Sequence, residues 1–313
     1  MFEAGSLLRA LDIYLVENVV QSTIAVVLVI AFVHVLKIRD HALRVRLYLL
    51  PIFLPLIAPP VYYLLFPGRA EMPVLKLDRL LALEKIIPYQ QDGSLWGPAL
   101  TLVLILGLGF LLARSAVTVL AVLLIPRHHQ PFHVDKDSSL QKALASLAAK
   151  AGIRQPRILL SESSRRPACV FALMGHSYLL LPAGWLDGPS PEVLKTTVAH
   201  EIAHLKRGDH HLMPFLRFAR GLLFFNPAVH LASALVAREA ELASDQVALE
   251  LGIEPADYGH GLVLAWQTAS GAGAKEIRER VEAVLAPTLA MDRPRWAFPG
   301  VAATLGITLF FLC

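Results

Sequence analysis

The chain has 313 residues, 55% of them hydrophobic and only 17% charged, and a mean hydropathy of +0.55. This composition is far from that of an average soluble domain and predicts a membrane protein with several spans and room for one soluble domain. The net charge of +4 would suit a nucleic-acid partner, but much of the basic excess flanks apolar segments, so direct nucleic-acid binding is not expected. With two cysteines, the chain has neither a disulfide framework nor a Cys-rich zinc site.

Residues 1–131 are expected to form a membrane domain with three spans, because three apolar segments are each long enough to cross a bilayer. The loop at 37–46 carries four basic residues against one acid, which places it in the cytoplasm and the N-terminus outside. The first segment is too long, and lacks the basic start, for a cleaved signal peptide. The predicted spans are residues 13–36, 47–66 and 97–125.

Two weaker features lie in this first part. Prolines at positions 51, 55, 59 and 60 predict kinks in the second span. Residues 74–87 favour a short amphipathic helix at the membrane surface, with an ordinary loop helix as the alternative.

Residues 132–290 have the composition of a water-soluble domain and are predicted to face the cytoplasm. Their periodicity predicts both helices and strands. A helix is expected at 138–151, strands at 157–161 and 177–181, a strand and turn at 167–175, and a helix that begins after Ser190 and ends near Gly208.

The last of these helices contains His200-Glu201-x-x-His204. Positions i and i+4 share one helix face, so both imidazoles can bind one metal ion while Glu201 lies beside it as a candidate base. About 0.02 such patterns are expected by chance in this chain, so the match is suggestive and its context decides. The alternative is a pair of core or surface histidines. Apolar residues on other faces, Val198, Ile202 and Leu205, are expected to anchor the helix in a core.

Residues 212–237 are almost as apolar as a membrane span. A single crossing would put everything after it on the other side of the bilayer, where no residue could complete the site at His200 and His204. We therefore expect a helical hairpin with Asn226-Pro227 at its tip, lying in or against the membrane.

The returning arm of this hairpin carries Glu241 and Asp245, again at i and i+4. One carboxylate can be the third zinc ligand and the other can accept the outer N–H of a ligating histidine. We assign Glu241 to the metal and Asp245 to the histidine, with a solvated acidic face as the alternative. Farther on, residues 274–286 read as a solvated amphipathic helix, and residues 291–313 form a short fourth span that ends outside.

At this point the chain resembles the BlaR/MecR family of bacterial membrane metallopeptidases. The resemblance rests on three motifs in the family's order, set within three spans, a zinc domain and a fourth span. They are His200-Glu201-x-x-His204-x-x-Arg207-x-Asp209, then Phe225-Asn226-Pro227, then Arg238-x-x-Glu241-x-x-x-Asp245.

The resemblance implies a mostly α membrane protein with four transmembrane helices and a cytoplasmic α+β gluzincin-like protease domain, in the bacterial cytoplasmic membrane. It implies one zinc ion held by His200, His204 and Glu241, with Glu201 as the catalytic base. Asp245, Asp209 and Arg238 are then expected to support the ligands. An edge strand is expected to hold the substrate extended beside the metal, and it comprises Ser177, Tyr178, Leu179, Leu180 and Leu181.

The implied function is cytoplasmic cleavage of a protein or peptide substrate, either a transcriptional repressor or the chain itself, in signal transduction. The lipid bilayer is a further expected partner, and a homodimer is left open. Family members that sense β-lactams carry an additional penicillin-binding domain, for which this sequence has no room after Cys313.

Two other functions fit part of this pattern. A prenyl-protein type of membrane zinc protease shares the metal motifs but encloses its site within more spans. A non-catalytic signalling scaffold with a structural zinc would explain the ligands but not Glu201, because a structural site needs no base.

Overall fold

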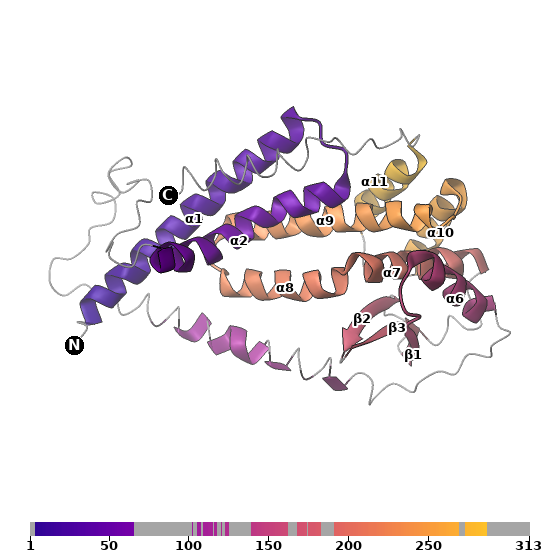
Figure 1. Cartoon of the computed structure of the whole chain (residues 1–313), viewed down its shortest axis with the longest axis horizontal. Helices are drawn as coiled ribbons and strands as arrows, with labels where there is room; N and C mark the ends of the chain where they lie inside the picture. Colours follow the sequence, from indigo (N-terminus) through magenta and orange to yellow (C-terminus); the bar gives the residue numbers. More distant parts are fainter. Residues whose placement is uncertain are drawn as a thin grey trace. The chain divides into compact units, whose positions relative to one another are not determined.

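The computed structural model of the chain describes residues 4–65, individual positions between 102 and 124, and residues 139–161, 168–173, 175–182, 191–268 and 273–286. These residues are mostly helical, with one small sheet (Figure 1). The chain divides into two compact units. The first comprises Met1–Ser115, Phe218–Val236 and Asp292–Cys313, and the second comprises Ala116–Arg217 and Ala237–Met291.

In the first unit, helices α1 (Ala4–Val35) and α2 (His41–Leu65) pack against each other. Within the described residues, one segment, Asn18–Val35 of α1, is long and apolar enough to cross a membrane. It lies in the first predicted span. The second predicted span, 47–66, coincides with α2 up to Leu65, and the third is described only in part. The surface helix at 74–87 and the fourth span lie outside the described residues. The number of spans therefore stays a prediction.

Helices α8 (Asp209–Leu222) and α9 (Pro227–Glu250) form the predicted helical hairpin, with Asn226 at its tip. The Asn226 side-chain oxygen accepts hydrogen bonds from the main-chain N–H groups of Ala228 and Val229, which caps α9. Its amide nitrogen donates to Asn18 and Ser22 of α1. The predicted tip is therefore confirmed, and it is anchored to the first apolar helix.

The second unit contains the sheet, whose strands are β1 (Arg157–Ser161), β2 (Cys169–Leu173) and β3 (His176–Pro182). The strand order is β1-β3-β2, with β1 parallel and β2 antiparallel to β3. All three strands agree with the sequence predictions. The unit's helices are α6 (Ser139–Ala151), α7 (Pro191–Arg207), the last part of α9, α10 (Pro255–Thr268) and α11 (Ala274–Leu285).

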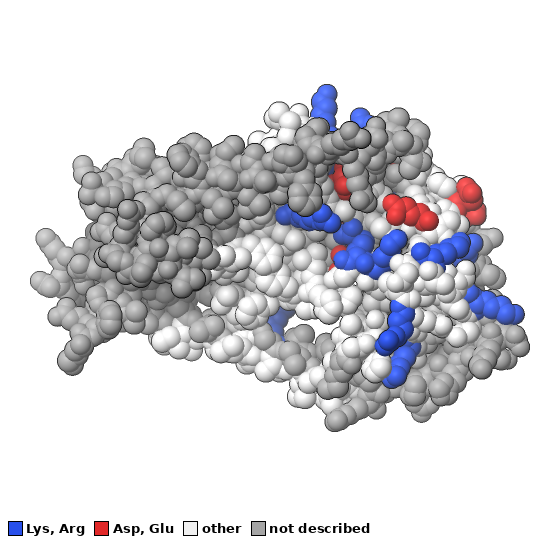
Figure 2. All heavy atoms as spheres, in the orientation of Figure 1, with Lys and Arg blue, Asp and Glu red and all other residues white. Residues whose placement is uncertain are grey.

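The core of the second unit forms around α7. Val198 and Ile202 of this helix are fully buried in an apolar cluster with residues of α6, the sheet, α9 and α10. Helix α10 comes so close to α7 that a Cβ at Gly261 would lie 2.7 Å from the Cβ of Thr196, so only glycine fits there. On the face in Figure 2, side chains of both charges are interspersed over this unit, as expected for a surface in contact with water.

Helix α7 ends at Arg207 because Gly208 adopts a left-handed conformation, with φ +78°, that favours glycine. Helix α8 begins at the next residue, Asp209. This sharp end confirms the predicted role of Gly208, and it brings the Asp209 side chain back towards the helix that carries the histidines.

Candidate metal centre

Helix α7 presents His200 and His204 side by side, as their spacing predicts. Their Nε2 atoms lie 3.0 Å apart, and both rings are largely buried. The opposite face of α7 is fixed in the core by Val198 and Ile202. The pair is therefore held rigidly by the packing of its own helix.

Helix α9 brings Glu241 to the same point. Its Oε2 lies 3.3 Å from Nε2 of His200, and its Oε1 lies 3.6 Å from Nε2 of His204. Two ligands of a tetrahedral zinc ion, each about 2.0–2.1 Å from the metal, are separated by ~3.3 Å. The three side chains offer ligand atoms within 4.8 Å of one another. Donor type and spacing both fit a zinc site with two histidines and one carboxylate.

Each histidine has its own carboxylate behind it. For His204, the ring Nδ1–H donates to Oδ2 of Asp209 at 2.8 Å. The same oxygen accepts hydrogen bonds from Arg207 at 3.0 Å and from the hydroxyl of Ser244 at 3.1 Å. Burial acts to raise the pKa of Asp209, but the bond from His204 and the charge of Arg207 lower it. Because an ionised Asp209 accepts a hydrogen bond from the Nδ1–H of His204, the other ring nitrogen, Nε2, carries no proton and can bind a metal.

For His200, the corresponding carboxylate is Asp245, whose Oδ1 lies 3.1 Å from the ring Nδ1. The buried hydroxyl of Tyr258 donates to the same Oδ1 at 2.8 Å. Asp245 is 1% exposed, so its charge needs these partners. Asp245 and Asp209 thus lie where a group that orients a ligating histidine has to be.

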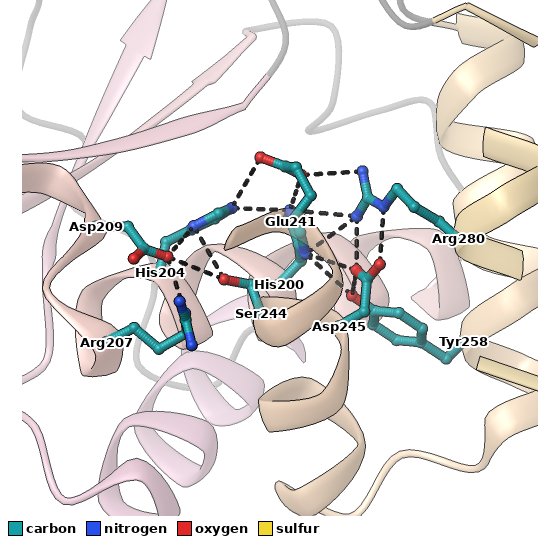
Figure 3. Close-up of polar contacts among 9 residues, drawn as sticks. All are labelled: His200, His204, Arg207, Asp209, Glu241, Ser244, Asp245, Tyr258 and Arg280. Carbon is teal, nitrogen blue, oxygen red and sulfur yellow. Dashed lines mark hydrogen bonds and ion pairs between the residues drawn. The ribbon is translucent and has the colours of Figure 1, made fainter. Parts of the chain in front are cut away.

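Arg280 of α11 connects the two carboxylates of α9 (Figure 3). Its Nη1 lies 3.1 Å from Oε2 of Glu241, and its Nε donates to Oδ2 of Asp245 at 2.8 Å. Its Nη2 donates to Oδ1 of Asp245 at 2.6 Å. Burial acts to raise the pKa of Asp245, but the bonds from Arg280 and His200 lower it. One guanidinium therefore bridges the two acids, and for Asp245 its hydrogen bonds are the strongest influence that lowers the pKa.

The pKa values of His200 and Glu241 are shifted in opposite directions. Burial and the Arg280 charge act to lower the pKa of His200, but its hydrogen bonds with Asp245 and Glu241 outweigh them and raise it to about 9. Burial acts to raise the pKa of Glu241, but the bond from His200 and the charges of His200, His204 and Arg280 hold it well below its usual range. Ion pairs thus join Glu241 to both histidines and to Arg280.

Glu201 lies next to the first histidine on α7 and is 8% exposed. Burial raises its pKa, while the charges of the two histidines and a hydrogen bond from the main chain of Val170 act against that rise. The carboxylate is thus placed between the metal-binding face of α7 and strand β2. A buried carboxylate with a raised pKa can accept and return a proton near neutral pH.

Strand β3 does not have the position predicted for Ser177–Leu181. It is the middle strand, with β1 on one side and β2 on the other, so its main-chain groups are already paired. Leu179 and Leu181 pack towards the main core, and Tyr178 and Leu180 pack on the opposite face. The assignment of this strand as the edge is therefore wrong. Among the described strands, the one at an edge and in contact with Glu201 is β2.

Arg238 also differs from its predicted role. It is half exposed and pairs with Glu279 of α11, with Nη2 2.9 Å from Oε2, and it bonds to neither histidine nor to Glu241. The expectation that it supports the ligands directly is therefore wrong. Its guanidinium instead binds the helix from which Arg280 reaches the site.

Three residues of this network were not predicted from the sequence: Ser244, Tyr258 and Arg280. Tyr258 lies on α10, a helix that Pro255 at its first position could have signalled. The helix at 274–286 was expected to be solvated, yet Arg280 is 8% exposed. Its position on the same face as Ile277 and Val284 is a detectable sign that this arginine is turned inwards.

Comparison with known proteins identifies the family of the chain. A sequence model of the family described as BlaR1 peptidase M56 matches residues 15–283, which is most of the chain. No individual curated protein matches it.

Proposed function

The chain belongs to the BlaR1 peptidase family M56, a family of membrane-associated metallopeptidases, and from this premise we propose that it is a zinc endopeptidase that cuts proteins at the cytoplasmic face of the membrane. The observation that carries the proposal is the triangle of Nε2 of His200, Nε2 of His204 and the Glu241 carboxylate, with Glu201 on the same helix. A zinc ion held by these three side chains would supply Lewis acidity towards a peptide carbonyl and towards water.

In the proposed reaction, Glu201 accepts a proton at its carboxylate when water attacks the scissile carbonyl, and returns that proton to the departing amine. Its burial and raised pKa suit both steps. Asp209 and Asp245 keep the proton of each histidine on Nδ1, so that Nε2 remains available for the metal. Glu201 also favours this function over a signalling scaffold with a structural zinc, which would need no base.

We assign the binding of the substrate main chain to β2. The main chain of Val170 contacts Glu201, so this side of the strand faces the reacting groups. Hydrogen-bonding groups alternate in direction along a strand, so Ala172, two residues farther, offers its N–H and C=O on the same side. An extended peptide added beside β2 would pass along Glu201.

The proposed substrate is a cytoplasmic protein such as a transcriptional repressor, or the chain itself. The basic segment at 37–46 supports a cytoplasmic placement of the zinc domain, and the Asn18–Val35 segment fits a membrane span. The four spans, the outside termini and the 132–290 domain boundaries belong to the same proposal. The location of the metal ligands on α7 and α9, outside Asn18–Val35, argues against a prenyl-protein type of site enclosed by spans.

Comparison of wild type with Glu201→Gln tests this function. Cells that produce the wild type should contain protein fragments with new N-termini that are missing in cells with Glu201→Gln. Glu282→Gln is the matched control, because it makes the same chemical change on the exposed side of α11. The same new N-termini in all three would refute a hydrolytic role for this site.

A further inference from the structure

Helix α11 takes part in the metal centre although it carries none of the metal ligands. It has twelve residues, packs against α10, and is buried at Ile277, Arg280 and Val284. Val284 belongs to the apolar core and Ile277 is buried, while Arg280 extends into the site (Figure 3). The only charged side chain on the buried face of this helix is therefore the one that contacts Glu241 and Asp245.

The Arg280 guanidinium offsets the repulsion between two neighbouring carboxylates. Glu241 and Asp245 lie one turn apart on α9, with side chains 30% and 2% exposed, so two carboxylates of like charge stand close together with little screening by water. Arg280 makes two bonds to Asp245 and an ion pair with Glu241, which fixes both carboxylates relative to α9. A lysine has a single charged nitrogen and cannot reproduce this fork.

A second ion pair joins the same two helices outside the site. Arg238 lies three residues before Glu241 on α9, and its partner Glu279 is the neighbour of Arg280 on α11. The side chains of Arg238 and Glu279 are 52% and 33% exposed, so this outer pair lies at the surface. It can therefore be changed without altering any group that contacts a metal ligand.

We propose that α11 is a docking helix whose attachment completes the metal site, with Arg280 as the positioning residue for Glu241 and Asp245 and with the outer pair Arg238–Glu279 holding the helix in place. This inference rests on the proposed zinc site. Release of α11 would withdraw Arg280, so Glu241 and Asp245 would no longer be held in the positions where they face the metal and His200, and zinc affinity falls. A signal that reaches α11 can thus switch the metal site without touching a ligand.

Thermodynamic linkage supplies a readout that does not depend on catalysis. If docking of α11 strengthens zinc binding, zinc must strengthen docking by the same factor. Amide hydrogen exchange over residues 274–285 of the full-length protein should therefore slow when zinc is added, and it should slow less in Arg280→Gln. Both measurements use a Glu201→Gln background, which removes hydrolysis and keeps the proposed ligands.

The variants separate positioning from simple stability. Arg280→Gln should weaken zinc binding about 10–100-fold, the range for residues that orient metal ligands, and Arg280→Lys should recover only part of it. Arg238→Glu and Glu279→Arg should each weaken zinc binding, and the double exchange should restore it. Arg278→Glu is the matched control, because this exposed side chain pairs within α11 and should leave zinc binding unchanged.

The outer-pair exchange keeps the test decisive even if Arg280→Gln does not fold. Unchanged zinc affinity in Arg238→Glu and Glu279→Arg, or equal zinc protection of α11 in Arg280→Gln and its parent, would overturn the docking role while leaving the zinc site intact. Absence of zinc binding in the parent would overturn the proposed function as well.

Discussion

The substitution Asp245→Asn tests the hydrogen-bond network around His200, because it replaces one carboxylate oxygen by an amide nitrogen. The substitution keeps the side-chain shape but removes the charge that pairs with Arg280 and the acceptor that orients His200. The new amide group also points a donor at the guanidinium or at the hydroxyl of Tyr258. Asp245 is 1% exposed, so water cannot replace the lost partner.

The expected cost follows from these contacts. Removal of one partner of a buried ion pair typically costs ~3–5 kcal/mol. Arg280 keeps its contact with Glu241 at 3.1 Å, so we expect the lower end, ~3 kcal/mol. For a domain of this size, each kcal/mol shifts the Tm by ~2–4 °C, which gives a decrease of ~6–12 °C. Loss of the histidine's partner should also weaken zinc binding ~10–100-fold.

Thermal unfolding and zinc titration of the purified full-length protein, after removal of metal by a chelator, measure the two effects. Asp257→Asn is the matched control, since it makes the same change at an exposed position in the first turn of α10. Equal Tm values and equal zinc affinities for the two variants would show that Asp245 is part of a solvated acidic face and would refute the reasoning.

Three further predictions concern packing, protons and topology. Gly261→Ala should lower stability by ~1–3 kcal/mol, because the new Cβ would collide with Thr196. Gly273→Ala is the control and should change the Tm little, because a Cβ there meets no neighbour. Equal Tm values for the two variants would contradict the close packing of α10 on α7. Since the pKa of metal-free His200 is about 9, its ring is protonated at pH 7, so zinc binding should release about one proton there and should strengthen as the pH rises towards 9. Calorimetry in buffers of different ionisation enthalpy measures this release, and a value near zero at pH 7 would contradict it. Reporters fused after residue 46 or within 132–160 should face the cytoplasm. Reporters fused near residue 92 or after residue 313 should lie outside. If tags at positions 150 and 255 lie on opposite sides of the membrane, the hairpin is excluded.

Local spacing allowed the centre of the site to be predicted. The i, i+4 positions of His200 and His204 place both rings on one helix face whatever surrounds the helix. The need for a third ligand then led to Glu241, and to a hairpin rather than a span between residues 212 and 237. The tip at Asn226 followed from the proline after it, and the structure agrees.

The parts that failed depend on long-range arrangement. Strand positions do not determine strand order, so the parallel pairing of β1 with β3, which makes β3 the middle strand, could not be read from residues 177–181. Arg280 lies 35 residues after Asp245, and its inward direction depends on how α11 docks. A charged helix is normally solvated, and only the position of Arg280 among apolar residues distinguishes this one.

The most direct test of the central claim is the zinc content of the purified protein, measured by elemental analysis for wild type, Glu201→Gln and Glu241→Gln. We predict about one zinc ion per chain for wild type and for Glu201→Gln, because Glu201 is a base and not a ligand, and much less for Glu241→Gln, because Glu241 completes the triangle with the two histidines. Full occupancy in Glu241→Gln, or loss of zinc in Glu201→Gln, would contradict the assignment of ligands and base.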